Sequence, residues 1–321
     1  MVDPKKGCPP RCGYGLLGLC CSSCLSGPCR RSPFDDKSGG RFCGEDSDWI
    51  VAHNVMERVS RESLQAMAAL RDALERVSGP GNRMEASRLT EMKRLLSPFY
   101  RGESALLEML YPERAFPFLH ALKFPPGSWS VALLDAAAAR PETHDIEAQL
   151  ESALRLSAMT LAAEALLGEL AGMAPEETGL PLPETPAPLL LLVSDEDGLP
   201  NDGRDAAHKE IEAACRETVW ICKLRHMAQL PALGRKIYDQ WGIPASMSGS
   251  LAVVASSSMI HGLGALALGF SLAAVPAYPI HGSPRVENYL THHLQQTFGH
   301  AYLPVQPEED FVEQILGGLK R

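Results

Sequence analysis

Seven of the nine cysteines of this 321-residue chain lie close to its N-terminus: Cys8, Cys12, Cys20, Cys21, Cys24, Cys29 and Cys43. An odd total does not fit a closed disulfide framework, and so many thiols in a reducing compartment require a use. Glycines such as Gly13, Gly18 and Gly27 separate the cysteines, and glycine lets a backbone wrap closely around one point. The pattern predicts a Cys-rich, metal-binding head over residues 1–45.

The spacing of the cysteines divides them into two sets. Four thiolates that converge on one point suit either zinc or a cubane iron-sulfur cluster, and such a set is supplied by Cys21, Cys24, Cys29 and Cys43. Neighbouring side chains rarely converge on one metal, so we expect Cys20 to serve a different centre, together with Cys12. A two-fold dimer would double this pair to four ligands on its axis. Cys8 as a third ligand is an alternative, so the count alone does not require a bridging cluster.

Residues 46–173 have the apolar periodicity of helices. We expect a long helix over Asp46–Leu74 and further helices over Met84–Leu96, Ser104–Leu110 and Asp145–Leu170. The stretch 174–188, with the sequence APEETGLPLPETPAP, is rich in proline and acid and has no periodicity. It is therefore predicted to be a linker between an all-α domain and the rest of the chain.

Residues 189–321 alternate between strand and helix patterns. Leu189–Ser194 is a continuous apolar run, as expected of a strand that is buried on both faces. We expect further strands at 251–255, 274–278 and 302–305, and helices near 205–227, 233–241, 259–273, 285–298 and 308–319. This alternation predicts a parallel sheet with helices on both sides. The predicted fold class is thus α+β and multidomain, with a helical domain followed by an α/β domain.

Two regions of the sequence resemble one known family. The run from Cys12 to Arg30, CGYGLLGLCCSSCLSGPCR, followed by Pro33-Phe34, Cys43-Gly44 and Ile50-Val51-Ala52, is similar to the N-terminal signature of nickel-iron carbon monoxide dehydrogenases. Val253–Ser256, Ala265–Gly269, Gly282–Val286 and Leu290-Thr291 resemble the last, Rossmann-like domain of that family. The resemblance implies that Cys12 and Cys20 bridge a [4Fe-4S] or [2Fe-2S] cluster between two subunits. It also implies that Cys21, Cys24, Cys29 and Cys43 bind a buried [4Fe-4S] cluster.

The catalytic part of the family pattern is missing. The nickel-iron-sulfur centre of the family needs a histidine and further cysteines, whereas this chain has only Cys215 and Cys222 outside the head. The position of the family's catalytic lysine falls at Gly264, and Ser60–Leu70 replaces the expected histidine ladder. The resemblance therefore implies the electron-transfer clusters without the middle domain and without a family-type nickel centre.

Composition and charge narrow the function classes. The net charge of -9 argues against a nucleic-acid partner, because phosphate neutralisation needs a basic surface. The N-terminal sequence MVDPKKGCPP lacks the apolar run of a secretory signal, so we expect a cytoplasmic protein. Serines, a histidine and prolines interrupt the apolar stretch Leu251–Ile280, which favours a buried core over a membrane span.

We therefore expect a homodimeric iron-sulfur protein that passes electrons to a redox partner such as a ferredoxin or a larger oxidoreductase subunit. Arg30 and Arg41 are expected to offset the negative charge of a thiolate-bound cluster. One alternative is a compact oxidoreductase related to carbon monoxide dehydrogenase, whose active centre is built from Cys215, Cys222 and histidines or comes from another subunit. Another alternative is a regulatory or scaffold subunit of a larger relative.

We expect the cysteines and histidines outside the head to be structural residues rather than metal ligands. Cys215 and Cys222 lie seven positions apart, which predicts a buried core pair on one helical face rather than a ligand set. We expect five histidines that are scattered through the second half of the chain to lie at the surface or to be hydrogen-bonded. They are His261, His281, His292, His293 and His300.

Overall fold

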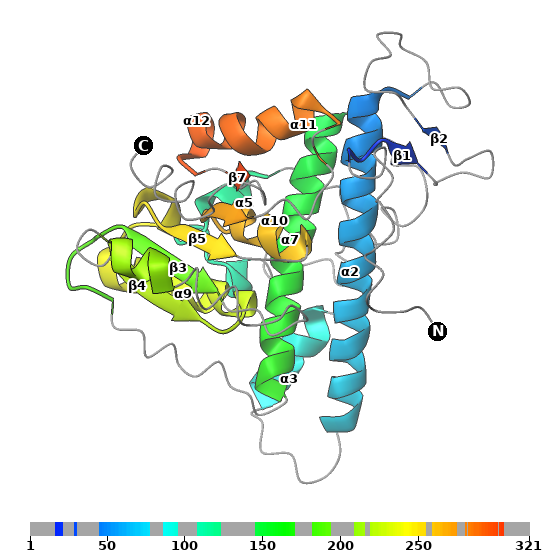
Figure 1. Cartoon of the computed structure of the whole chain (residues 1–321). Coiled ribbons are helices and arrows are strands. Elements are labelled where there is room, and N and C mark those ends of the chain that lie inside the picture. Colours follow the sequence, from blue (N-terminus) through cyan, green and yellow to red (C-terminus); the bar gives the residue numbers. More distant parts are fainter. Residues whose placement is uncertain are drawn as a thin grey trace, which may run out of the picture.

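Two long helices, α2 (Ser47–Val77) and α7 (Ile146–Leu170), run side by side in the same direction through the computed structural model (Figure 1). The structure describes residues 17–21, 29–30, 45–77, 86–95, 108–122, 145–170, 182–193, 209–215, 219–254, 259–274, 280, 282–300 and 302–304. An aspartate precedes each long helix and accepts hydrogen bonds from the amides of its first turn. Asp46 Oδ1 accepts from the Trp49 amide at 2.8 Å, and Asp145 Oδ1 accepts from the Glu147 amide at 3.0 Å.

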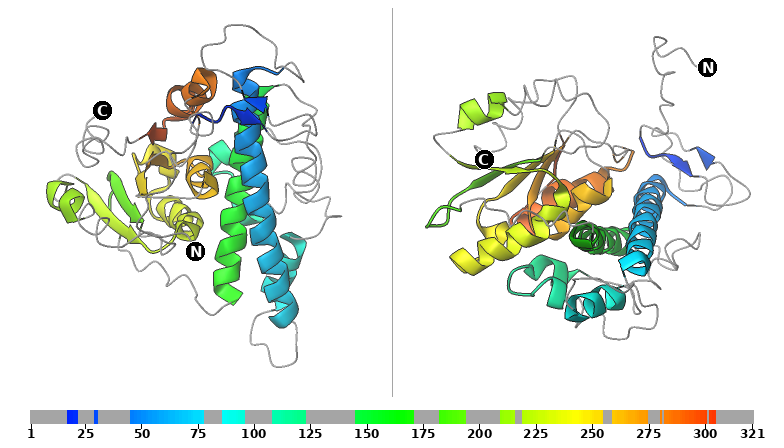
Figure 2. Two further views of the ribbon diagram at one scale, coloured as in Figure 1. Left: turned by 45° about the vertical axis from the view of Figure 1, so that its right-hand side comes forward. Right: turned by 90° about the horizontal axis from the view of Figure 1, so that it is seen from below.

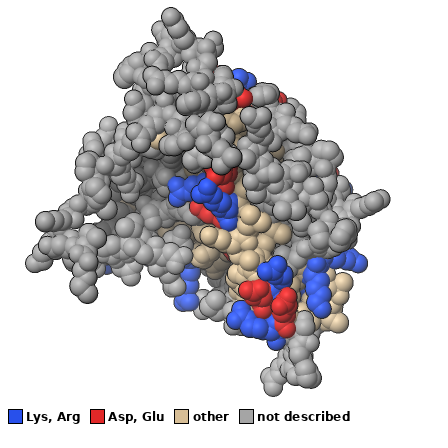
Figure 3. Space-filling view, turned by 90° about the vertical axis from the view of Figure 1, so that its right-hand side faces the viewer, with Lys and Arg blue, Asp and Glu red and all other residues tan. Residues whose placement is uncertain are grey.

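The exposed face of α2 carries charged side chains of both signs. Figure 3 shows basic and acidic side chains next to each other on the described part of this face. Pairs one helical turn apart account for this mixture, among them Arg58 with Glu62 at 3.2 Å and Arg61 with Glu57. The described part of this face therefore carries no patch of a single charge.

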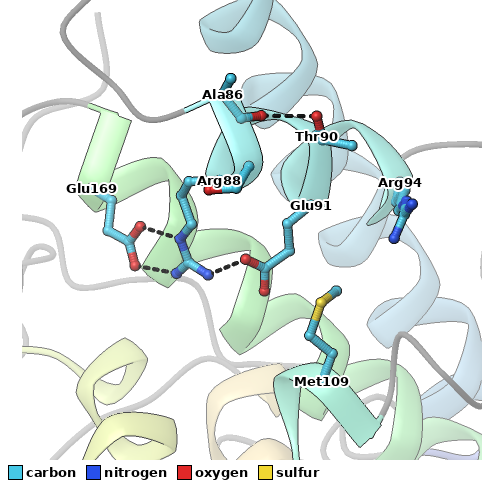
Figure 4. Close-up of a pocket in the computed structure, with 8 residues that line it drawn as sticks. Ala86, Arg88, Thr90, Glu91, Arg94, Met109 and Glu169 are labelled. Carbon is cyan, nitrogen blue, oxygen red and sulfur yellow. Dashed lines mark hydrogen bonds and ion pairs between the residues drawn. The ribbon is translucent and has the colours of Figure 1, made fainter.

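A short helix, α3 (Ala86–Leu95), is fixed to the C-terminal end of α7 by one arginine. Arg88 donates two hydrogen bonds to the Glu169 carboxylate, at 2.8 and 2.5 Å, and also pairs with Glu91 (Figure 4). These side chains line an open surface hollow of about 860 Å³ together with Arg94 and Met109. The two carboxylates neutralise Arg88, so the hollow holds no concentration of positive charge for an anion.

Among the described residues of the C-terminal half, five parallel strands form one sheet. They are β3 (Leu189–Val193), β4 (Trp220–Leu224), β5 (Leu251–Val254), β6 (Ser271–Ala274) and β7 (Tyr302–Pro304). Their order in the sheet is β4-β3-β5-β6-β7. The chain first adds a strand on one side of β3 and then continues on the other side, so the direction of winding reverses between β3 and β5. Ligands of open parallel sheets commonly bind beyond the carboxyl ends of the strands at such a reversal.

Helices cover both faces of this sheet. Leu189, Leu191 and Val193 of β3 face the main core, to which α9 (Leu230–Trp241) and α10 (Met259–Ala267) also contribute. Leu190 and Leu192 face a second cluster that includes Ile211, from the helical stretch 209–215. Figure 2 shows this stretch on the side of the sheet opposite to α9 and α10. The prediction of a strand buried on both faces is thereby confirmed for Leu189–Val193, and Ser194 lies outside the described residues.

The sequence predicted most of the described elements correctly, but it missed β4 and misplaced the end of α10 and the start of β6. The expected helix 205–227 is wrong over residues 220–224, which form β4 with alternating exposed and buried positions. The expected helix 259–273 ends at Ala267, and β6 begins at Ser271 rather than at 274. Gly269, with φ of +85°, turns the chain between them. The expected last helix, Glu308–Leu319, and the expected helix 104–110 before residue 108 lie outside the described residues.

The remaining helical elements follow the prediction or are too short to have been predicted. The expected helix 285–298 consists of α11 (Pro284–Asn288), the π-helical turn η3 (Tyr289–His293) and α12 (Leu294–Phe298). Short elements are α5 (Pro117–Ala121) and the 3₁₀ turns η1 (Met227–Gln229) and η2 (Ala245–Met247). Within the described part of the chain, no helix has the length and apolar character needed to cross a bilayer.

Helix α7 lies at the centre of the molecule, between α2 and α10 (Figure 2). Gly264 of α10 faces α7 so closely that a Cβ there would lie 2.9 Å from Leu161 Cγ and 3.2 Å from the Ser157 carbonyl oxygen. One hydrophobic cluster therefore runs from α2 through α7 to the sheet. The boundaries of the segments 1–45, 46–173, 174–188 and 189–321 stay predictions.

Candidate metal centres

Two short strands bring part of the cysteine head together. β1 (Cys20–Cys21) pairs antiparallel with β2 (Cys29–Arg30), with Cys21 opposite Cys29 and Cys20 opposite Arg30. Residues directly opposite in an antiparallel pair have Cα atoms roughly 4.5–5.5 Å apart. The ladder thus places two of the four predicted cluster ligands at adjacent positions of the backbone.

The first turn of the head is fixed to α2 by one side chain. The Asn54 amide donates to the carbonyl oxygens of Gly18 and Cys20, at 2.7 and 2.8 Å. Leu19, between them, is fully buried and belongs to the main core. The backbone next to Cys20 is therefore positioned by α2, and Cys20 itself is partly buried.

The C-terminal half of the chain holds the same turn from the other side. The Gly282 amide donates to the Leu17 carbonyl oxygen at 2.9 Å. Ser283 Oγ donates to Asp48 Oδ1 at 2.6 Å and accepts from the Val286 amide at 3.0 Å, so it caps α11 while it binds the first turn of α2. The head, the start of α2 and the start of α11 thus meet at one junction.

Several predicted residues lie outside the described residues. These are Cys8, Cys12, Cys24, Cys43, Arg41 and His281. For Cys21, Cys29 and Arg30 the structure describes the strand position and not the side chain. The predicted ligand sets, Cys21, Cys24, Cys29 and Cys43 for one cluster and Cys12 with Cys20 for the other, therefore stay predictions.

The two cysteines outside the head do not form a pair. Cys215 packs in the cluster that includes Ile211, whereas Cys222 on β4 packs in the main core. Both are buried, as expected, but the expected common helical face is wrong because a strand begins between them. Burial raises the pKa of the Cys222 thiol to about 11, so at neutral pH Cys222 is protonated and is a weak nucleophile.

The predicted histidines are spread over the fold. His292 and His293 are exposed on η3, where His293 stacks on Tyr289 with ring centroids 5.1 Å apart. His300 is buried against Phe118, at 4.7 Å between ring centroids. Only His261 belongs to a group of three described metal-ligating side chains.

That group joins three elements far apart in the sequence. His261 of α10 lies with its Nε2 2.8 Å from Oε2 of Glu164 on α7, and the His226 ring contacts the His261 ring edge to face at 5.2 Å. One ligand atom from each of the three lies within 4.8 Å of the other two. His226 precedes η1, where its Nδ1 accepts the Ala228 amide hydrogen at 3.0 Å. The sequence analysis missed Glu164 and His226, because their proximity depends on the packing of α7 against α10 and on the end of β4.

A second group of three lies at the surface. Glu108, Glu113 and His120 bring their ligand atoms within 4.8 Å of one another, but both carboxylates belong to exposed residues. His120 Nε2 is engaged by the Tyr111 carbonyl oxygen at 2.6 Å. Among the described residues, neither of the two groups contains a cysteine.

Comparison with known proteins confirms the resemblance over short segments. No protein-family model matches the chain. A segment of 51 residues is 45% identical to the carbon monoxide dehydrogenase of Rhodospirillum rubrum, and one of 53 residues is 43% identical to carbon monoxide dehydrogenase 2 of Carboxydothermus hydrogenoformans. Each segment is 16% of this chain and 8% of the relative. The chain is therefore related to carbon monoxide dehydrogenases over a small fraction of their length.

Solved structures of the same group of enzymes align over a longer stretch. Carbon monoxide dehydrogenase IV from Carboxydothermus hydrogenoformans aligns with 97% of this chain, at 16% identity and a TM-score of 0.41. A nickel-free carbon monoxide dehydrogenase from Thermococcus sp. AM4 aligns with 97% of the chain, at 15% identity and a TM-score of 0.42. In both cases the chain spans 55% of the solved chain, about half of its length.

Proposed function

We propose that this chain is an iron-sulfur electron-transfer protein related to carbon monoxide dehydrogenases. In this proposal Cys21, Cys24, Cys29 and Cys43 bind one [4Fe-4S] cluster in each chain. Cys12 and Cys20 bind a second cluster, [4Fe-4S] or [2Fe-2S], together with the same residues of a second copy. The observation that carries the proposal is the pairing of Cys21 with Cys29 across the β1–β2 ladder.

The strand register fits the two ligand sets. Cys21 and Cys29 occupy opposite positions of adjacent strands, and Cys24 falls within the connection between those strands. Cys20 and Cys21 are successive positions of β1, and successive positions of a strand belong to opposite faces. This supports the assignment of Cys20 and Cys21 to different centres.

The rigid attachment of the head suits electron transfer. A thiolate-bound iron-sulfur cluster supplies one-electron chemistry, with a potential set by cluster type, hydrogen bonds and solvent exposure. The role of this chain's residues is to hold the ligands at fixed positions. Asn54 and Gly282 bind the backbone on either side of Leu19, so the cluster ligands begin from a fixed point on α2 and α11.

We further propose that the chain lacks carbon monoxide oxidation at a family-type nickel centre. Cys215 and Cys222 lie in separate hydrophobic clusters, which argues against a common metal. Gly264, at the position where the resemblance places the family's catalytic lysine, is packed against Leu161 and Ser157 of α7, which leaves no room for a long side chain. Both observations support electron transfer over catalysis by this chain alone.

The partners in this proposal are a second copy of the chain and a redox protein in the cytoplasm, such as a ferredoxin or a larger oxidoreductase subunit. A homodimer is required because two thiolates from each chain complete the bridging site. Sedimentation of the anaerobic protein should give a dimer, and a monomer that retains both clusters would contradict the bridging site.

The decisive experiment is anaerobic quantitation of iron, sulfide, nickel and zinc, combined with electron paramagnetic resonance of the reduced protein. The proposal predicts no nickel and about six irons per chain if the bridging cluster is [4Fe-4S], or about five if it is [2Fe-2S]. A Cys12→Ser, Cys20→Ser double variant should retain about four irons per chain and become monomeric. The matched control is Cys222→Ala, which removes a buried thiol on β4 and should leave the iron content unchanged.

Other outcomes would contradict the proposal in distinct ways. Stoichiometric nickel together with carbon monoxide oxidation would show a catalytic centre. Zinc without iron would reduce the head to a structural site. Copurification of a full-length dehydrogenase in a fixed ratio would instead support a regulatory or scaffold subunit.

A further inference from the structure

Three side chains that commonly bind metals meet between α7, η1 and α10. Glu164 comes from α7, His226 directly precedes η1, and His261 lies in the first turn of α10. His261 Nε2 and Glu164 Oε2 are 2.8 Å apart, and one ligand atom of His226 lies within 4.8 Å of both partners. The group thus offers two imidazoles and one carboxylate at a single point.

The group also lies at the edge of the sheet where ligands are expected. His226 comes two residues after the carboxyl end of β4, and His261 lies in the helix that follows β5. β3 separates these two strands in the sheet, and the winding reverses between β3 and β5. The strand order of the sheet does not depend on the residue types, and it predicts a binding site at the same place where the three ligating side chains meet.

We infer that Glu164, His226 and His261 bind one divalent first-row transition-metal ion. Two imidazoles and a carboxylate suit Zn²⁺ or Co²⁺ rather than Mg²⁺ or Ca²⁺, which prefer oxygen ligands. Three protein ligands leave coordination positions for water or a small ligand, as in metal sites that act on a substrate. This site is separate from the cysteine head and goes beyond the proposed electron-transfer function.

The site is accessible to solvent, and metal binding requires only a small movement of His226. The side chains of His261 and Glu164 are 10% and 23% exposed, so an ion can enter from solvent. Metal–ligand bonds of about 2.0–2.1 Å place neighbouring ligand atoms roughly 3–3.5 Å apart. The distance between His261 and Glu164 already permits this geometry, and His226 moves inward to complete it.

The hydrogen bonds around His226 show which contacts metal binding would alter. Its Nδ1 accepts the Ala228 amide hydrogen at 3.0 Å, so the proton of a neutral ring is on Nε2. Coordination through Nε2 transfers the ring proton to Nδ1 and gives up the hydrogen bond from Ala228. Gln229 Oε1 accepts from the Arg225 amide at 2.8 Å, which holds the start of η1 when that bond is lost.

The test uses zinc on the cluster-loaded, anaerobic chain. After incubation with zinc and removal of loosely bound ions by a weak chelator, zinc is counted per chain and its ligands are determined by X-ray absorption at the zinc K-edge. We expect about one zinc per chain with nitrogen and oxygen ligands at about 2.0–2.1 Å. His261→Gln and Glu164→Gln should each weaken zinc binding at least about tenfold.

A second variant and a matched control keep the test decisive. His226→Asn removes the imidazole but retains an N-cap acceptor for Ala228, so η1 should stay folded while zinc binding weakens. His120→Gln alters the other described group of three ligating residues and should leave the zinc content unchanged. Equal zinc in wild type and His226→Asn, or a sulfur shell at about 2.3 Å, would overturn the assignment. Iron content, measured on the same samples, tests the cluster proposal separately.

Discussion

The Gly282 amide donates a hydrogen bond to the Leu17 carbonyl oxygen at 2.9 Å and so joins two parts of the chain that are more than 260 residues apart. A Cβ at position 282 would meet that carbonyl oxygen and would also lie 2.8 Å from Leu19 Cγ. The close approach of the two segments is therefore possible only for glycine. Ser283 extends the contact to Asp48, so the junction connects the head to both halves of the fold.

A Gly282→Ala variant should loosen the cysteine head. The added methyl group must push away the Leu17 carbonyl, which costs on the order of 1–3 kcal/mol of stability and should lower the retained iron under anaerobic purification. Gly234→Ala is a matched control, because its Cβ would lie 2.9 Å from Phe116 Cζ, away from the junction. That variant should also lower the unfolding midpoint but keep its iron. Equal iron loss in both variants would show that Gly282 acts only through global stability.

Asn54 should control the local opening of the head. Asn54→Ala leaves the carbonyl oxygens of Gly18 and Cys20 without their donor, which costs on the order of 1–3 kcal/mol. We expect faster amide hydrogen exchange over residues 17–21 than in wild type, measured by mass spectrometry. Asn288→Ala, at an exposed position of α11, is the control and should leave exchange in that segment unchanged. Unaltered protection in Asn54→Ala would show that the burial of Leu19 alone fixes the turn.

The parts of the fold that the sequence predicted best have an unambiguous pattern. α2 and α7 follow from long helical periodicity, and β3 follows from a continuous apolar run that is buried on both faces. β4 was missed because it directly follows a helical sequence and alternates exposed and buried positions at the edge of the sheet. The end of α10 was missed because residues 259–274 are apolar almost throughout, so periodicity does not separate helix from strand.

The two candidate sites also differ in how far the sequence alone predicts them. The opposition of Cys21 and Cys29 lies within a short segment, where cysteine spacing already predicts a common site. Glu164 and His261 are 97 residues apart and meet only because α10 packs against α7. No local pattern of residue types carries that information, which resides in the packing of one helix against another.

Arg88 should hold α3 against the end of α7. The hydrogen bonds that Arg88 donates to Glu169, and to a smaller extent to Glu91, raise the pKa of Arg88 against the opposing effect of its partial burial, so it remains charged throughout the working pH range. Arg88→Met removes both pairs and leaves two carboxylates close together. We expect a loss on the order of 1–3 kcal/mol in the free energy of unfolding, measured with urea. Arg94→Met, an exposed change on the same helix, should cost less than about 0.5 kcal/mol. Similar losses in the two variants would contradict a specific role for Arg88.

His300 should make the fold less stable in acid. Burial beside Phe118 and Phe298 lowers the pKa of His300 to about 4, from the ordinary value of 6.5. Above pH 6.5 the His300 ring is neutral in both the folded and the unfolded chain, so it does not change the free energy of unfolding. Between pH 6.5 and about 4 the ring binds a proton in the unfolded chain but not in the folded chain, which favours unfolding. Stability should therefore fall as the pH decreases from about 6.5 to about 4, by on the order of 3 kcal/mol. His53, whose pKa is also lowered by burial, adds to the same trend.

The free energy of unfolding should be measured with urea at a series of pH values. It should depend less steeply on pH in His300→Gln than in wild type, and as steeply as in wild type in His292→Gln, which changes an exposed residue. Parallel pH profiles for wild type and His300→Gln would exclude His300 as the origin of the trend.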